Sequence, residues 1–122
     1  MLAPEMFARL VLWDLKGSST TIDELRAYLR DESVDAFAAV PGLRFKAWLA
    51  DREANRWGAW YLWETREAGE RPMPSRARDL IGKDPDVSEW FDLEASVEGA
   101  FSDAAAMLTR RGLAFEPPPP GG

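Results

Sequence analysis

The chain has 122 residues, and neither cysteine nor histidine is among them. Without cysteine there is no disulfide bond, no thiolate zinc site and no cysteine nucleophile. Without histidine there is no imidazole ligand for a metal or haem, and no serine–histidine–aspartate triad. The sequence also lacks a phosphate-binding loop and a dinucleotide fingerprint. We therefore expect no metal and no cofactor, so that any catalysis must use carboxylates, amines, guanidinium groups, hydroxyls or aromatic rings.

Positive charge and long apolar runs are also scarce. The net charge of −6 argues against nucleic-acid binding, because phosphate neutralisation needs a basic surface. No apolar run approaches the roughly 20 residues of a membrane-spanning helix. The N-terminal segment carries Glu5 and lacks the basic region of a signal peptide. We expect a cytoplasmic protein with no nucleic-acid partner and no membrane partner.

Four segments have the composition of β-strands. They are short, they mix β-branched and aromatic residues, and turn-forming sequences separate them. The alternation of apolar and polar residues is clearest in the second segment, which indicates a half-buried strand. The predicted strands cover residues 6–15, 43–50, 57–65 and 86–97.

A helix is predicted between the first two strands. Thr21 and Glu24 have the spacing of a capping box, in which the two side chains satisfy free backbone N–H groups reciprocally. The apolar stripe that follows shifts near Glu32, which indicates one helix with a kink or break there, and a Pro-Gly pair ends it. Shorter helices are predicted over residues 76–81 and 102–112. Ser75 is the expected cap of the first, which ends at Gly82, and Ser102 is the expected cap of the second.

This order of elements, β-α-β-β-α-β-α, indicates the α+β class. It predicts a ferredoxin-like fold, which is a four-stranded antiparallel sheet with helices on one face. Residues 1–112 are predicted to form this single domain. Residues 113–122 are rich in proline and glycine and are predicted to be a disordered tail.

Strand alternation divides the sheet residues into two sets. One set is mainly aliphatic, and we expect the helices to cover it. The other set combines large aromatic rings with charged groups, and it would form the uncovered face. That face would expose Trp13, Trp48, Tyr61, Trp63 and Trp90. So large an apolar patch is unusual on a monomer, which predicts a homodimer whose two sheets enclose a cavity with aromatic walls.

Three motifs carry a family resemblance: PGLRFKAW at residues 41–48, GAWYLWE at 58–64 and WFDL at 90–93. In this order of elements they resemble the YdhR-like mono-oxygenases of the dimeric α+β barrel superfamily. The resemblance implies a ferredoxin-like protomer, a homodimer and a pocket between sheet and helices. It further implies mono-oxygenation of a polycyclic aromatic or quinol-type substrate without metal or flavin.

Charged and aromatic residues of the second set form the candidate site. Tyr61 is a candidate proton donor, and Lys46 and Arg9 are candidates for holding a phenolate or another anion. Contacts with the substrate are expected from the other candidates, which are Trp13, Arg44, Trp48, Trp63, Trp90 and Asp92. The expected partners are therefore a small aromatic ligand and a second copy of the chain.

Each candidate also has a structural explanation. The tryptophans could form the core of a dimer interface, Tyr61 could be an ordinary half-buried strand residue, and the cations could pair with acids across the sheet. The alternative function is a non-catalytic small-molecule-binding or stress-associated barrel. A third possibility is a structural dimer whose aromatic face is packed without a cavity.

Overall fold

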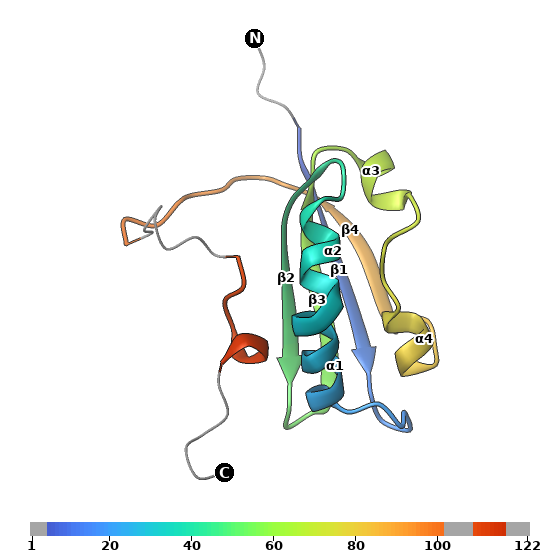
Figure 1. The fold of residues 1–122 in the computed structure, drawn as a ribbon. Coiled ribbons are helices and arrows are strands. Elements are labelled where there is room, and N and C mark those ends of the chain that lie inside the picture. Colours follow the sequence, from blue (N-terminus) through green and yellow to red (C-terminus); the bar gives the residue numbers. More distant parts are fainter. Residues whose placement is uncertain (1–4, 102–108, 117–122) are drawn as a thin grey trace.

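The computed structural model describes residues 5–101 and 109–116. A four-stranded antiparallel sheet forms one layer, and helices pack on one of its faces, which is a small α+β arrangement (Figure 1). The strand order is β2-β3-β1-β4, so β2 and β4 are the edges. The strands are β1 Phe7–Asp14, β2 Leu43–Asp51, β3 Arg56–Trp63 and β4 Val87–Asp92. All four predicted strands are confirmed, but β4 ends before residue 97 because its partner β1 begins at Phe7, opposite Asp92.

The segment between β1 and β2 forms a helical run that packs on the sheet. Its N-terminus is capped as predicted, because Oγ1 of Thr21 accepts a hydrogen bond from the backbone N–H of Glu24 at 3.1 Å. The irregularity predicted near Glu32 is a π-helical turn. The run consists of α1 Ile22–Tyr28, the π-helical turn η1 Leu29–Ser33 and α2 Val34–Ala38.

Two short helices connect β3 to β4. The sequence did not predict the first, α3 (Arg66–Glu70), which begins after Thr65 with the side chain of that threonine as its cap. The helix predicted over residues 76–81 is confirmed as α4 (Ala77–Ile81). It ends at Gly82, whose φ of 95° lies in the left-handed region that glycine adopts without strain.

The C-terminal segment differs from the prediction. The helix predicted over residues 102–112 lies mostly outside the described residues, and its described end is not helical. Leu113–Phe115, which the sequence assigned to the tail 113–122, forms the 3₁₀-helix η3. Ala114 is buried in the core cluster, and its carbonyl oxygen accepts a hydrogen bond from Arg30 at 2.8 Å. These contacts attach the start of the predicted tail to the domain.

The helices cover the aromatic set of strand residues, so the expectation that they cover the aliphatic set is wrong. Val11 and Trp13 are buried in one cluster with Leu25 of α1, and Phe37 of α2 packs edge-on against Trp48. The physical reason is size. A large ring removes about 150–250 Å² from water, which exceeds what a small aliphatic side chain removes. Alternation separates the two sets but does not say which set lies inside.

The other side of the sheet is the open face, defined here by the aliphatic set of strand residues. No helix in the described parts of the chain packs on it (Figure 1). Two of its side chains are strongly exposed, Leu49 at 44% and Phe91 at 50%. The strand register places its apolar residues in rows, with Phe45, Leu62, Ala8 and Phe91 in one row and Ala47, Trp60 and Leu10 in the next.

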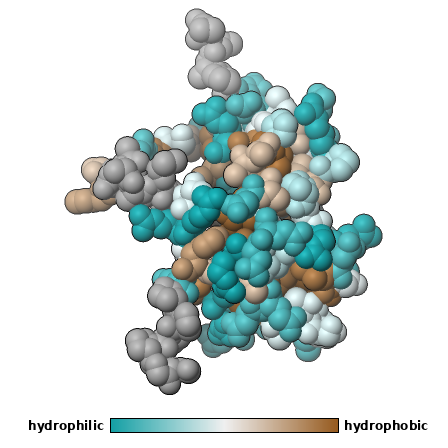
Figure 2. Space-filling model, viewed as in Figure 1, coloured by the Kyte–Doolittle hydropathy of each residue, from teal (hydrophilic) through white to brown (hydrophobic). Residues whose placement is uncertain are grey.

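The surface on the helix side is mainly hydrophilic, with apolar residues visible between the helices (Figure 2). Ion pairs connect elements there, as when Arg76 donates to both carboxylate oxygens of Glu32 and joins the start of α4 to η1. Such exposed pairs contribute little to stability. Among the described residues, no helix is both long and apolar enough to cross a membrane.

Candidate functional site

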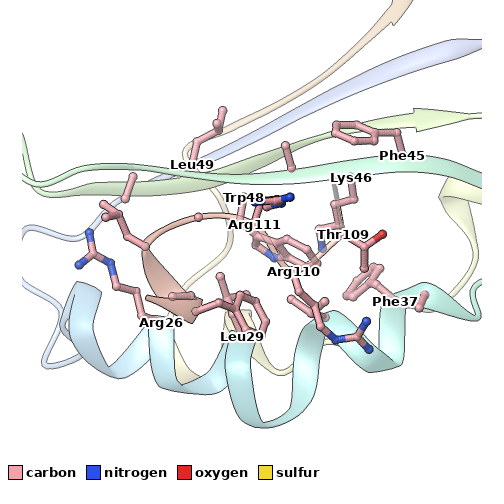
Figure 3. A pocket seen from close by; sticks show the side chains of 18 of the residues that line it. Arg26, Leu29, Phe37, Phe45, Lys46, Trp48, Leu49, Thr109, Arg110 and Arg111 are labelled. Carbon is pink, nitrogen blue, oxygen red and sulfur yellow. The ribbon is translucent and has the colours of Figure 1, made fainter. Parts of the chain in front are cut away.

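A cavity of about 580 Å³ lies between the edge strand β2, the helical run α1–α2 and the C-terminal segment 109–115 (Figure 3). This volume is within the usual range of small-molecule sites. Its apolar walls include Leu29, Phe37, Trp48 and Phe115. The cavity lies between sheet and helices, which is where the family resemblance implies a pocket.

The charged side chains that line the cavity are all basic. They are Arg26, Arg44, Lys46, Arg110 and Arg111. No aspartate or glutamate is among the described lining residues, although the chain as a whole carries a net charge of −6. Arg26, Arg44 and Arg110 have acidic partners, which are Asp23 at 3.9 Å, Glu64 at 3.2 Å and Asp35. A wall of this kind favours an anionic or electron-rich ligand. The described parts of the chain hold no cluster of acidic side chains suited to a metal ion.

The amine of Lys46 lies among three aromatic rings at the wall of this cavity. Its Nζ is 3.3 Å from the ring centroid of Phe37, 4.3 Å from that of Trp48 and 4.4 Å from that of Tyr61. Within the described residues it makes no hydrogen bond and no ion pair. Burial lowers the pKa of Lys46 to about 6, because an ammonium loses its hydration there. The amine is therefore mainly neutral at pH 7.

Tyr61 lies directly opposite Lys46 on the neighbouring strand β3. Its ring stacks on Trp63, with 5.8 Å between the ring centroids and 15° between the planes. Burial raises the pKa of Tyr61 to about 12, so the phenol keeps its proton and can donate it in a hydrogen bond. Lys46 and Tyr61 also border a second space of about 20 Å³, which is room for one water molecule.

Arg9 lies in the same row of the sheet as Tyr61, and Trp90 ends that row on β4. Its guanidinium donates to the carbonyl oxygen of Gly69 at 3.1 Å and to Oγ of Ser88 at 2.8 Å. It also lies 5.2 Å from the ring centroid of Trp90. These contacts hold the end of α3 against β4, at the edge of the sheet opposite to the edge strand β2 that lines the cavity. The guanidinium is thus engaged in joining structural elements.

Trp13 and Trp63 are packed in the core. Trp13 is 8% exposed, and its Nε1 donates to the carbonyl oxygen of Lys83 at 3.0 Å. Trp63 is 1% exposed, and Gly69 packs so closely on it that a Cβ at Gly69 would lie 2.9 Å from its Nε1. Neither ring is among the described lining of the cavity, and Asp92 is exposed at the far edge of the sheet.

Three of the predicted site residues line the cavity, namely Arg44, Lys46 and Trp48. Tyr61 joins them through its contact with the Lys46 amine. Sequence reasoning missed the other walls, above all Phe37. That residue was recognisable only as part of an apolar helix stripe, and the C-terminal wall had been divided between a predicted helix and a tail.

No protein-family model matches the sequence, and no curated protein matches it either. The resemblance to a mono-oxygenase family therefore stays a prediction. Because fold alone does not determine function, the activity has to be argued from the chemistry of the cavity.

Proposed function

We propose that the protein is a cofactor-independent mono-oxygenase whose substrate is an aromatic, quinol-type small molecule bound in the cavity. The observation that carries this proposal is the Lys46 amine, which is mainly neutral at pH 7 and borders the cavity within a cage of aromatic rings. A neutral amine in this position can act as a general base toward a phenolic hydroxyl. The sequence resemblance to YdhR-like mono-oxygenases points to the same class of reaction.

In the first step, Lys46 takes a proton from the bound phenol or quinol. The ammonium that forms stays beside the phenolate, and the ring faces of Phe37 and Trp48 attract it. The basic side chains of the cavity wall also favour the phenolate over the neutral phenol. The site therefore supports the ion pair that this step creates.

The electron-rich phenolate then donates electrons to O₂. In an anthrone-type substrate, which reacts as its phenolic tautomer, a ring CH₂ group becomes a carbonyl. One atom of O₂ enters the product, and the other leaves as water with the two hydrogens of the CH₂ group. The substrate supplies all the electrons, so the reaction requires neither metal nor flavin. With a pKa of about 12, Tyr61 keeps its proton at neutral pH and can donate a hydrogen bond, through one water molecule in the smaller space, to the oxygen that leaves as water.

The proposed assembly is a homodimer of ferredoxin-like protomers. The strand order β2-β3-β1-β4, with a helical run between β1 and β2, supports this topology. The open face supports the dimer, because a two-fold axis would place its apolar rows against the same rows of a second copy. Packing two sheets in this way would form an α+β barrel. The cavity would then lie within each protomer, and not between the two sheets.

Oxygen consumption tests the oxygenase proposal directly. The wild-type protein should accelerate O₂ uptake with at least one member of a panel of anthrones and quinols. The Lys46→Met variant should lose this activity. The same compound should still bind and quench the tryptophan fluorescence of the variant, because the aromatic wall remains. No acceleration by the wild-type protein over buffer, across the panel, would contradict the proposal.

A non-catalytic small-molecule-binding protein is the second candidate. One observation favours it: Tyr61 lines the smaller space and not the main cavity, so a ligand there meets no tyrosine directly. Tyr61→Phe separates the two functions. An enzyme should lose turnover and keep its ligand, whereas a binding protein should show unchanged affinity and no turnover before or after the substitution.

A further inference from the structure

The Lys46 amine has a second chemical property, which oxygenation does not use: it is an unpaired nucleophile beside a cavity. We propose that it captures aldehydes and ketones that enter the cavity, by forming an imine between Nζ and the carbonyl carbon. The ligand class is an aromatic aldehyde or ketone, since the carbonyl must reach an amine surrounded by Phe37, Trp48 and Tyr61. This reaction needs no O₂ and does not depend on the oxygenase proposal.

The surroundings of Nζ distinguish Lys46 from the two other lysines of the chain. Lys83 forms an ion pair with Asp86 at 2.9 Å, and Lys16 is exposed in the turn after β1. Lys46 makes no ion pair with any described residue, and it borders both the main cavity and the smaller space. A desolvated lysine without an acidic partner, next to a cavity of ligand size, is typical of Schiff-base chemistry.

Only the neutral form of an amine attacks a carbonyl group. With a pKa of about 6, most Lys46 amines are neutral at pH 7. An exposed lysine with a pKa of about 10.4 is neutral in only about 0.04% of molecules at that pH. The neutral form of a less basic amine also attacks a carbonyl group more slowly. Its rate constant falls in proportion to about the square root of its basicity. Together these effects leave Lys46 with an advantage of about tenfold.

The reaction balances without an oxidant or reductant. The lone pair of Nζ forms the C–N bond, and the C=O π electrons move to oxygen, which takes up a proton. Nitrogen loses a proton to give a carbinolamine. Its hydroxyl then takes up a second proton from the solvent, and the C–O bond breaks with loss of water to leave a protonated imine. Tyr61, opposite Lys46 and protonated at neutral pH, can reach the departing oxygen through a water molecule in the smaller space that both side chains border. The surrounding ring faces attract the cationic imine.

Reductive trapping tests the proposal within a single chain. The 122-residue chain is incubated under nitrogen at pH 7 with 4-carboxybenzaldehyde and sodium cyanoborohydride, and the adducts are located by peptide mass mapping. The carboxylate of the probe suits the basic cavity wall. Lys46 should gain the adduct about tenfold faster than Lys16, which serves as the internal reference for an exposed lysine.

The pH profile supplies a readout that accessibility alone would not reproduce. With cyanoborohydride in excess, so that addition of the amine limits the rate, labelling of Lys46 should reach half of its maximum near pH 6 and level off by pH 8, whereas labelling of Lys16 should still be rising at pH 8. The ionisable side chains that line the two spaces beside Nζ are Tyr61 of β3, Arg26 and Tyr28 of α1, Arg44 of β2, and Arg110 and Arg111 of the C-terminal segment, with Asp35 of α2 paired to Arg110. None is a histidine or a cysteine, the side chains that ordinarily titrate in this range.

Lys46→Met is the matched variant. It should lose the cavity adduct and keep the slow labelling of Lys16, with its fold checked by tryptophan fluorescence. Labelling of the wild-type protein in proportion to exposure, with Lys16 ahead of Lys46, would overturn the proposal. So would a Lys46 profile that follows that of Lys16. Since trapping is done without O₂, its failure and a failure of oxygenase activity are separate results.

Discussion

Replacing Lys46 with methionine should make the protein more stable at neutral pH. Methionine has a similar length, is apolar and packs well against aromatic rings. Burial lowers the pKa of Lys46 to about 6 in the native protein, against an ordinary value of 10.5 for the unfolded chain. Folding at pH 7 therefore requires the amine to release a proton that the unfolded chain keeps. The methionine variant folds without this cost.

Proton linkage provides the magnitude. Each pH unit between 7 and the unfolded pKa corresponds to about 1.36 kcal/mol, which amounts to about 5 kcal/mol at pH 7. Methionine is one atom shorter than lysine and leaves part of the aromatic cage unfilled, which reduces this value. We expect Lys46→Met to raise the free energy of unfolding by about 2–5 kcal/mol at pH 7.

The stability difference should depend on pH in one direction. Between pH 6 and pH 10.5 the unfolded chain binds more protons than the native protein, so the wild-type protein becomes more stable as pH rises. The methionine variant lacks this contribution, and its advantage should therefore be largest near pH 6 and shrink toward pH 10. The absence of histidine and cysteine keeps this window free of the side chains that ordinarily titrate there.

Urea unfolding at pH 6, 7, 8 and 9, followed by tryptophan fluorescence, measures both the size and the slope. Lys16→Met is the matched control, since Lys16 is exposed, and it should change the free energy of unfolding by less than about 0.5 kcal/mol at each pH. Two results would refute the reasoning. One is a methionine variant less stable than the wild type, and the other is a difference that does not change with pH. Either would mean that the amine stays protonated within its aromatic cage.

Three other substitutions test the fold and the proposed dimer. Gly58→Ala should lower the free energy of unfolding by about 2–3 kcal/mol or more, because the new Cβ would lie 2.2 Å from the carbonyl oxygen of Val11; thermal melting should show no such loss for Gly99→Ala, where the space is open. Thr21→Ala should cost about 1 kcal/mol in urea unfolding through loss of the helix cap. Trp60→Glu should shift sedimentation toward the monomer with unchanged circular dichroism, and a sedimentation profile like that of the wild type would count against the dimer through the open face.

Much of the local structure was predictable from the sequence, because it depends on neighbours along the chain. The alternation in residues 43–50 indicated β2, and the hydroxyl of Thr21 indicated where α1 begins. The shift of the apolar stripe near Glu32 marked the π-helical turn. The helix α3 escaped prediction because a single turn capped by Thr65 is too short to show a periodic pattern.

The candidate site was predictable only in part. Lys46 and Trp48 were identified because they belong to the set of strand residues that combines aromatic rings with charged groups, and both line the cavity. Trp13 and Trp63 were assigned to a ligand wall, whereas the structure packs them in the core. The period of a strand sorts residues into two faces without saying which face the helices cover, so the inside and the outside of the sheet were exchanged.

By itself, the sequence determined the excluded chemistry, the four strands with the helical run between the first two, and the two sets of strand residues, since these depend on composition and on spacing along the chain. Only the tertiary structure decided that the helices cover the aromatic set and that a cavity remains beside β2. It also decided the charge state of Lys46. The pKa of an amine depends on the groups that replace its water, and here those groups come from α2 and β3, far apart in the sequence from each other.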